Sequence, residues 1–177
     1  VGLSRNNGVG SADTVASVAR STRLATSLPV RRAISTRQMR NASAFSSRTR
    51  MVLLNTPHTP TGKVFTRAEL ELVCELAREH DAWVVTDEVY EHLAFDGAEH
   101  IAVASLPGMA GRALTISSAG KTFSTTGWKV GWVCGPAAAV AAVRAVKQFL
   151  ADGGAGPVQQ AVAEGLGLPD AVFAGLG

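Results

Sequence analysis

The 177-residue sequence has few cysteines and no long apolar run, and each shortage excludes a class of protein. Its two cysteines, Cys74 and Cys134, lie far apart, without a CxxC pattern or a histidine-rich neighbourhood. Neither a disulfide framework nor a metal site is therefore predicted, and a reducing compartment, the cytoplasm, is expected. No stretch of about 20 uninterrupted apolar residues is available to span a bilayer, so no membrane partner is expected.

Acidic residues are almost absent from the first 50 residues. This segment has nine arginines and a single acid, Asp13, whereas the rest of the chain has eight basic and thirteen acidic residues. The formal charge is therefore +8 before Met51 and −5 from Met51 onward, which gives the net charge of +3. Because the positive charge belongs to the leading segment, it is poor support for nucleic-acid binding by the folded part, and no nucleic-acid partner is expected.

Residues 1–48 also lack the regular spacing of apolar residues that is typical of a helix or a strand. Their arginine-rich, serine-rich and acid-poor composition resembles a mitochondrial transit peptide, which makes a mitochondrial location the alternative. A disordered linker, or a leader foreign to the fold, is the main expectation for this segment. Residues 49–150 are expected to form the folded domain, and residues 151–177 a truncated and poorly ordered remainder.

A pattern of strands and helices begins at Arg50. The apolar run at residues 51–55 ends in a Pro/Thr/Gly turn, which is typical of a buried strand in a parallel sheet. Thr66 and Glu69 have the spacing of a capping box, and apolar residues recur at helical spacing as far as His80. Further strands are predicted at residues 82–87, 113–116 and 130–134, and a helix at residues 137–150. The predicted fold is α/β, a mostly parallel sheet with helices on both faces.

Three polar segments follow these strands, where ligands gather in an open α/β sheet. Their sequences are NTPHTPTG at residues 55–62, DEVY at 87–90 and SSAGKTFSTTGWK at 117–129. In this order and spacing they resemble the class I aminotransferases of fold type I, closest to the branch of the kynurenine/glutamine and succinyldiaminopimelate aminotransferases. The resemblance extends over about 100 residues. It implies the cofactor pyridoxal 5'-phosphate (PLP) and transfer of an amino group between an amino acid and a 2-oxo acid.

The resemblance implies a role for each of several residues. Lys121 would hold the cofactor through its amine and later carry a proton, as the catalytic residue. Asp87 would pair with the pyridinium nitrogen, and Tyr90 would hydrogen-bond the phenolic oxygen of the ring. Ser118 and Lys129 would contact the phosphate. The alternatives without a cofactor are that Lys121 is a surface lysine, that the Asp87 carboxylate caps the next turn, and that Tyr90 is a packed aromatic ring.

The sequence departs from the family pattern at Thr59, where the family normally has Asn. A hydroxyl on a shorter stem replaces only part of the amide's hydrogen bonding to the cofactor, and losing one such bond costs about 1–3 kcal/mol. The upstream phosphate loop and the downstream small domain of the family are not found. Residues 49–150 are therefore expected to be the C-terminal half of the PLP-binding large domain of such an enzyme, incomplete as a catalyst. The resemblance also implies that intact relatives are homodimers. The alternative to an aminotransferase is a non-catalytic, truncated fragment.

Two other motifs compete for the same residues. The sequence Gly120-Lys121-Thr122 ends like a phosphate-binding P-loop, but that motif requires glycine at position 115, where Thr115 stands. Ser118 and Lys121 satisfy the SxxK pattern of penicillin-binding enzymes, yet the accompanying KTG and SDN motifs are absent. Both alternatives are therefore weaker than the aminotransferase interpretation.

Overall fold

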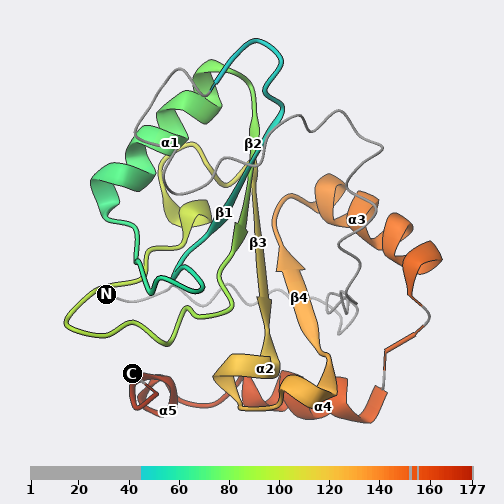
Figure 1. The fold of residues 1–177 in the computed structure, drawn as a ribbon. Helices are drawn as coiled ribbons and strands as arrows, with labels where there is room; N and C mark the ends of the chain where they lie inside the picture. The colour runs from blue at the N-terminus through green and yellow to red at the C-terminus, as the bar shows by residue number, and fades with distance from the viewer. Residues whose placement is uncertain (1–44, 152, 155, 177) are drawn as a thin grey trace.

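A computed structural model describes residues 45–151, 153–154 and 156–176. Its central feature is a four-stranded sheet with the strand order β1-β2-β3-β4 (Figure 1). Strand β1 (Met51–Asn55) runs parallel to β2 (Trp83–Asp87), which runs parallel to β3 (Ala113–Ser118). Strand β4 (Gly131–Cys134) is antiparallel to β3. The mostly parallel sheet is confirmed, and each strand ends within two residues of its predicted limits.

Helix α1 (Arg67–Glu79) begins with the predicted capping box. Thr66 Oγ1 accepts a hydrogen bond from the Glu69 N–H, and the Glu69 carboxylate accepts one from the Thr66 N–H. Lys63 Nζ donates to the same carboxylate at 2.8 Å. The buried face of α1 packs on one face of the sheet, in a core that includes Val52, Leu54, Leu70, Val73, Leu76, Ala77 and Val84.

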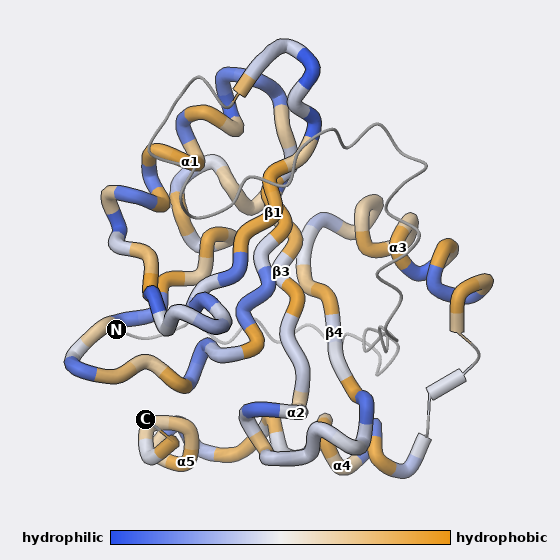
Figure 2. The backbone as a smooth tube through the Cα atoms, in the orientation of Figure 1, coloured by the Kyte–Doolittle hydropathy of each residue, from blue (hydrophilic) through white to orange (hydrophobic). Residues whose placement is uncertain are grey.

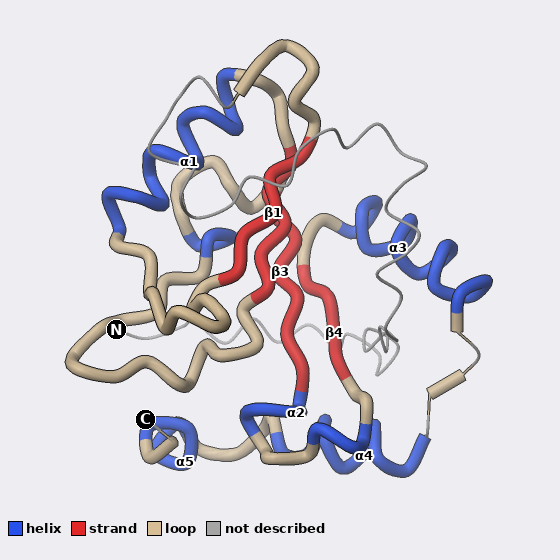
Figure 3. The backbone as a smooth tube through the Cα atoms, in the orientation of Figure 1, coloured by secondary structure: helices blue, strands red, loops and turns tan. Residues whose placement is uncertain are grey.

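Helix α3 (Ala137–Leu150) covers the opposite face of the sheet, as Figure 3 shows. Its partly buried residues Ala139, Val140 and Val143 pack against a cluster formed by Val85, Leu114 and Val133. Helices on both faces are therefore confirmed. Strand β1 appears apolar along most of its length in Figure 2. Its residues Val52 and Leu54 are buried in the core on the α1 side, whereas Leu53 is 46% exposed. In the part of the chain that is described, no helix is long and apolar enough to cross a membrane.

The segment after Gly153 is more regular than the sequence indicated. It forms helices α4 (Gly156–Gly165) and α5 (Asp170–Ala174), which lie below α2 (Ala119–Thr122) in Figure 1. Val162 of α4 is buried and packs against Ala119 and Val130. The two helices were not predicted because Gly, Ala and Pro give no clear apolar period. This segment is thus part of the packed structure and supports the short helix that carries Lys121.

Most of the segment expected to be disordered or foreign, residues 1–44, lies outside the described residues. Phe45 belongs to the same segment but is buried in the core on the α1 side of the sheet. Its ring stacks on His80, with the two ring centroids 5.5 Å apart. The packed structure therefore includes Phe45, ahead of the predicted boundary at residue 49.

Candidate functional site

The motif residues follow strands whose carboxyl ends lie side by side. Asn55 at the end of β1 is the register partner of Asp87 on β2, and Asp87 is the partner of Ile116 on β3. Strand β3 continues to Ser118, and α2 follows directly. The three predicted segments therefore meet at the edge of the sheet where open α/β folds bind ligands.

Lys121 and Tyr90 meet at this edge. Lys121 projects from α2, and its Nζ lies 5.4 Å from the centroid of the Tyr90 ring, within the range of a cation–π interaction. Tyr90 lies after β2 in two successive turns, closed by hydrogen bonds from the Glu91 N–H to the Glu88 carbonyl and from the Leu93 N–H to the Tyr90 carbonyl. Lys121 is exposed. Two of the predicted cofactor residues are thus brought together from separate strands.

Asp87 is half-buried, and this burial raises the pKa of its carboxyl above the ordinary value. A hydrogen bond from the Val89 N–H to Asp87 Oδ1, at 3.3 Å, opposes the rise, and the neighbouring charge of Glu88 adds to it. The hydrogen bond from Val89 is the contact expected if Asp87 caps the next turn. It occupies only one of the two carboxylate oxygens. In the described ranges no cationic side chain pairs with Asp87. A half-buried carboxylate without a cationic partner can accept a hydrogen bond from a protonated ring nitrogen.

Ser118 and Lys129 lie on the same loop region but differ in their contacts. The Ser118 hydroxyl, directly before α2, has no hydrogen-bond partner among the residues described. Lys129 is exposed, has a left-handed backbone with φ of 57°, and donates from Nζ to the Thr126 carbonyl at 2.8 Å. An anion could bind Ser118 directly, whereas the Lys129 ammonium is held within its own turn and would have to leave Thr126.

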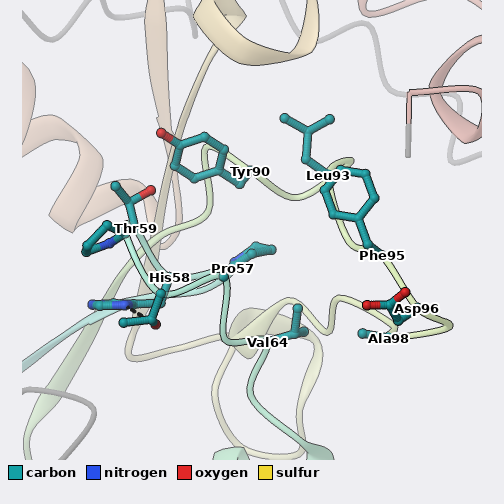
Figure 4. Close-up of a pocket in the computed structure, with 12 residues that line it drawn as sticks. Pro57, His58, Thr59, Val64, Tyr90, Leu93, Phe95, Asp96 and Ala98 are labelled. Atoms are coloured by element: carbon teal, nitrogen blue, oxygen red, sulfur yellow. Dashed lines mark hydrogen bonds between the residues drawn. The ribbon is translucent and has the colours of Figure 1, made fainter.

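Thr59 and Tyr90 both line an open pocket of about 800 Å³ (Figure 4). The exposed Thr59 donates its backbone N–H to Asn55 Oδ1 at 2.7 Å. Asn55 Nδ2 donates in turn to the Asp87 carbonyl at 3.0 Å. Asn55 therefore ties the Thr59 loop to the end of β2, a role that was not predicted from the sequence. The pocket lining also includes Pro57, His58, Val64, Leu93, Phe95 and Asp96, but not Asp87, Ser118, Lys121 or Lys129.

Behind Asp87, on the α1 side of the sheet, lie three ionisable residues that the sequence analysis did not identify. Glu88 is buried and accepts hydrogen bonds from Thr86 Oγ1 at 2.6 Å and from His100 Nε2 at 2.9 Å. Glu91 Oε1 accepts one from Ser117 Oγ at 2.8 Å. Ligand atoms of Glu88, Glu91 and His100 lie within 4.8 Å of one another. Only the acids of the DEVYE sequence hint at this cluster, because the contacts join residues distant in sequence.

The two sides of the sheet edge differ in how their polar groups are satisfied. Behind the edge, Glu88 and Glu91 are hydrogen-bonded to other side chains. In front of it, the Tyr90 hydroxyl and the Lys121 amine have no hydrogen bond in the described part of the chain. Four groups at this edge can still form hydrogen bonds: the carboxylate of Asp87, the phenol of Tyr90, the amine of Lys121 and the hydroxyl of Ser118. In that order they match the ring nitrogen, ring oxygen, aldehyde and phosphate of PLP. The residues present therefore fit that cofactor.

Comparisons with known proteins agree with this chemistry. A family model described as aminotransferase class I and II matches residues 30–173. A probable N-succinyldiaminopimelate aminotransferase of Mycobacterium tuberculosis is 51% identical over 133 residues, which cover 75% of this chain and 34% of that protein. Kynurenine–oxoglutarate transaminase 1 of Homo sapiens is 57% identical over 110 residues, which cover 62% of this chain and 26% of that protein.

Solved structures give the same result. The N-succinyldiaminopimelate aminotransferase of Mycobacterium tuberculosis superposes with a TM-score of 0.73 at 50% identity, covering 76% of this chain and 35% of that one. A double mutant of the Thermus thermophilus aspartate aminotransferase gives a TM-score of 0.69 at 32% identity, covering 79% and 35%. The chain thus spans about a third or less of the length of these relatives.

Proposed function

The chain belongs to the class I and II aminotransferase family, and on this premise we propose that it carries the lysine-bearing part of a PLP site. The reaction would transfer an amino group between an amino acid and a 2-oxo acid. The observation that carries the proposal is the approach of Lys121 to Tyr90 at the sheet edge that also holds Asp87. When bound, PLP supplies an electron-accepting ring.

Each residue at the edge has a task that its contacts allow. Lys121 would hold the cofactor covalently through Nζ, and once the amino group of the substrate has displaced it, the freed amine would carry a proton at that atom. Asp87 would hold the ring nitrogen, and the ion pair formed there would offset the burial that raises its pKa. Tyr90 would orient the ring through its hydroxyl, and Ser118 would bind the phosphate.

Thr59 and Lys129 are the weaker members of the proposed site. Thr59 lines the pocket beside Tyr90 and offers one hydroxyl where the family's amide offers two polar groups. Lys129 would contact the phosphate only after breaking its bond to Thr126. These two residues favour the second candidate function, a non-catalytic fragment that retains part of a PLP-binding domain.

The remaining assignments follow from the same proposal. The partners would be an amino acid and a 2-oxo acid. The resemblance implies a homodimer for intact relatives, which this chain alone is not expected to assemble. Both cysteines are free, with Cys74 buried and Cys134 exposed, which is compatible with a reducing compartment. We therefore retain the cytoplasm as the proposed location.

Borohydride reduction of the full chain in the presence of PLP tests the proposal. Reduction fixes the cofactor to the lysine with which it has condensed, and peptide mapping identifies that residue. We expect the label on Lys121, its loss in Lys121→Ala, and its retention in the control Lys147→Ala, because Lys147 lies on α3 and outside the proposed site. Label spread over several lysines would overturn the assignment. Turnover of an amino acid with a 2-oxo acid by the loaded chain then separates the enzyme from a cofactor-binding fragment.

A further inference from the structure

Glu88 stands between two of the proposed cofactor residues, Asp87 and Tyr90. We propose that its buried carboxylate is a positioning residue that fixes both of them at the sheet edge. The proposal rests on the proposed function for what Asp87 and Tyr90 do. The contacts that carry it do not involve the cofactor.

Three donors converge on the Glu88 carboxylate. Thr86 Oγ1 donates to Oε1 at 2.6 Å, the Val103 N–H donates to the same oxygen at 3.4 Å, and His100 Nε2 donates to Oε2 at 2.9 Å. The Glu88 side chain is only 1% exposed. A carboxylate is costly to bury unless its oxygens are hydrogen-bonded, so three partners in one geometry make Glu88 a fixed point of the chain.

Because the Glu88 side chain is held in place, the side of the sheet that Asp87 faces is also determined. Successive side chains of an extended strand point to opposite faces of the sheet. Thr86 and Val84 face the core on the α1 side, so Asp87 faces the side of Val85 and α3. With Glu88 held on the α1 side, the peptide unit between the two residues cannot rotate freely. Asp87 is therefore kept on the front of the sheet edge.

A second carboxylate holds the far end of the turn that carries Tyr90. The Glu91 N–H donates to the Glu88 carbonyl at 2.9 Å, which closes the turn. Glu91 Oε1 accepts a hydrogen bond from Ser117 Oγ of β3 at 2.8 Å. Tyr90 is thus bracketed by two anchored residues, and its ring is kept beside the Lys121 amine that projects from α2.

The single tyrosine of the chain gives a readout that needs no cofactor. Isotope-labelled tyrosine in the full chain produces one set of ring signals in a nuclear magnetic resonance spectrum, all from Tyr90. We expect Glu88→Ala to shift and broaden these signals. Glu88→Gln keeps an oxygen acceptor for the Thr86 hydroxyl and the Val103 N–H and should restore them. His100→Ala removes one donor and should give a smaller shift, which keeps the test open if Glu88→Ala does not fold.

Val73→Ala is the matched control, because Val73 is buried in α1 and belongs to the same core but not to the turn. It should lower the Tm without moving the Tyr90 signals. If Glu88→Ala and His100→Ala also lower the Tm and leave the signals unmoved, Glu88 is an ordinary structural residue and the proposal is overturned.

PLP labelling of Lys121 in the same variants separates this proposal from the proposed function. We expect Glu88→Ala to slow labelling on the order of tenfold, about the effect of losing one well-placed hydrogen bond. Labelling at an unchanged rate would reject the positioning role while leaving the proposed function intact. Absence of label on Lys121 in the unmodified chain, with Tyr90 signals that still respond to Glu88→Ala, would reject the function and support the anchor.

Discussion

The Lys121 amine lies 5.4 Å from the centroid of the Tyr90 ring, although the two residues follow different strands of the sheet. The contact uses the face of the ring, so the phenolic hydroxyl at its edge stays available. One side chain can therefore hold the lysine through its π face and the cofactor through its oxygen.

Tyr90→Phe separates these two tasks. The variant keeps the ring beside Lys121 and removes only the hydroxyl, so the free energy of unfolding should change by less than about 0.5 kcal/mol. Labelling of Lys121 by PLP and borohydride should slow roughly tenfold, because one hydrogen bond to the cofactor is lost. Tyr90→Ala, which removes the ring as well, should slow it further. Equal labelling rates for Tyr90→Phe and the unmodified chain would show that the hydroxyl does not contact the cofactor.

Asp87→Asn should stabilise the chain in the absence of cofactor while weakening PLP labelling. Burial raises the pKa of the Asp87 carboxyl in the folded chain. The protonated carboxyl therefore adds to the free energy of unfolding below the unfolded pKa, and this contribution is lost as the pH rises through the folded pKa. At neutral pH the ionised carboxylate is therefore a net cost. Asparagine removes that charge and keeps an oxygen for the Val89 N–H.

Urea denaturation at two pH values checks the Asp87→Asn prediction. The gain near neutral pH should be less than about 1 kcal/mol, because Asp87 is only partly buried and water screens it. The two proteins should converge below about pH 4, where both side chains are neutral. A difference that persists in acid would mean that the effect does not come from ionisation of the carboxylate.

The fold was predictable to the extent that its signals are local. Strand β1 is a short apolar run, and the capping box of Thr66 and Glu69 marks the start of α1 at Arg67. The Lys121–Tyr90 meeting could be anticipated, since adjacent parallel strands end at one edge. The Glu88–His100 pair could not, because it joins two loops through a contact that leaves no periodic pattern.

The salt bridge between Glu69 and Lys63 should make the stability of the chain depend on pH. The hydrogen bond from Lys63 is the main cause that lowers the pKa of Glu69. A lowered carboxyl pKa contributes stability above the unfolded pKa and loses it as the pH falls through the folded pKa. Lys63→Met should therefore reduce the free energy of unfolding at neutral pH and leave it nearly unchanged in acid. Urea denaturation across this range is the measurement, and Arg67→Met, which lies at an exposed ion pair, is the control. An equal loss at both ends of the range would contradict the linkage.

Gly131→Ala should destabilise the chain and disturb Ser118, whereas Gly127→Ala should do neither. A Cβ on Gly131 would lie 2.9 Å from the Ser117 carbonyl oxygen and 3.3 Å from Ser118 Cβ, because β4 approaches β3 closely there. Gly127 has no atom within 4 Å of the corresponding position. The sequence around Gly127 and Gly131 does not distinguish the two glycines, since close approach between strands is a property of the folded sheet.

The expected cost of Gly131→Ala is about 1–3 kcal/mol, the usual range for a group forced into packed surroundings. Thermal denaturation measures that cost, and PLP labelling of Lys121 reports on the site. Because the displaced residues lead directly into α2, labelling should slow as well in Gly131→Ala. A stable variant with unchanged labelling would show that β4 can move away from β3 without affecting the lysine, and that the two strands are not rigidly coupled at this edge.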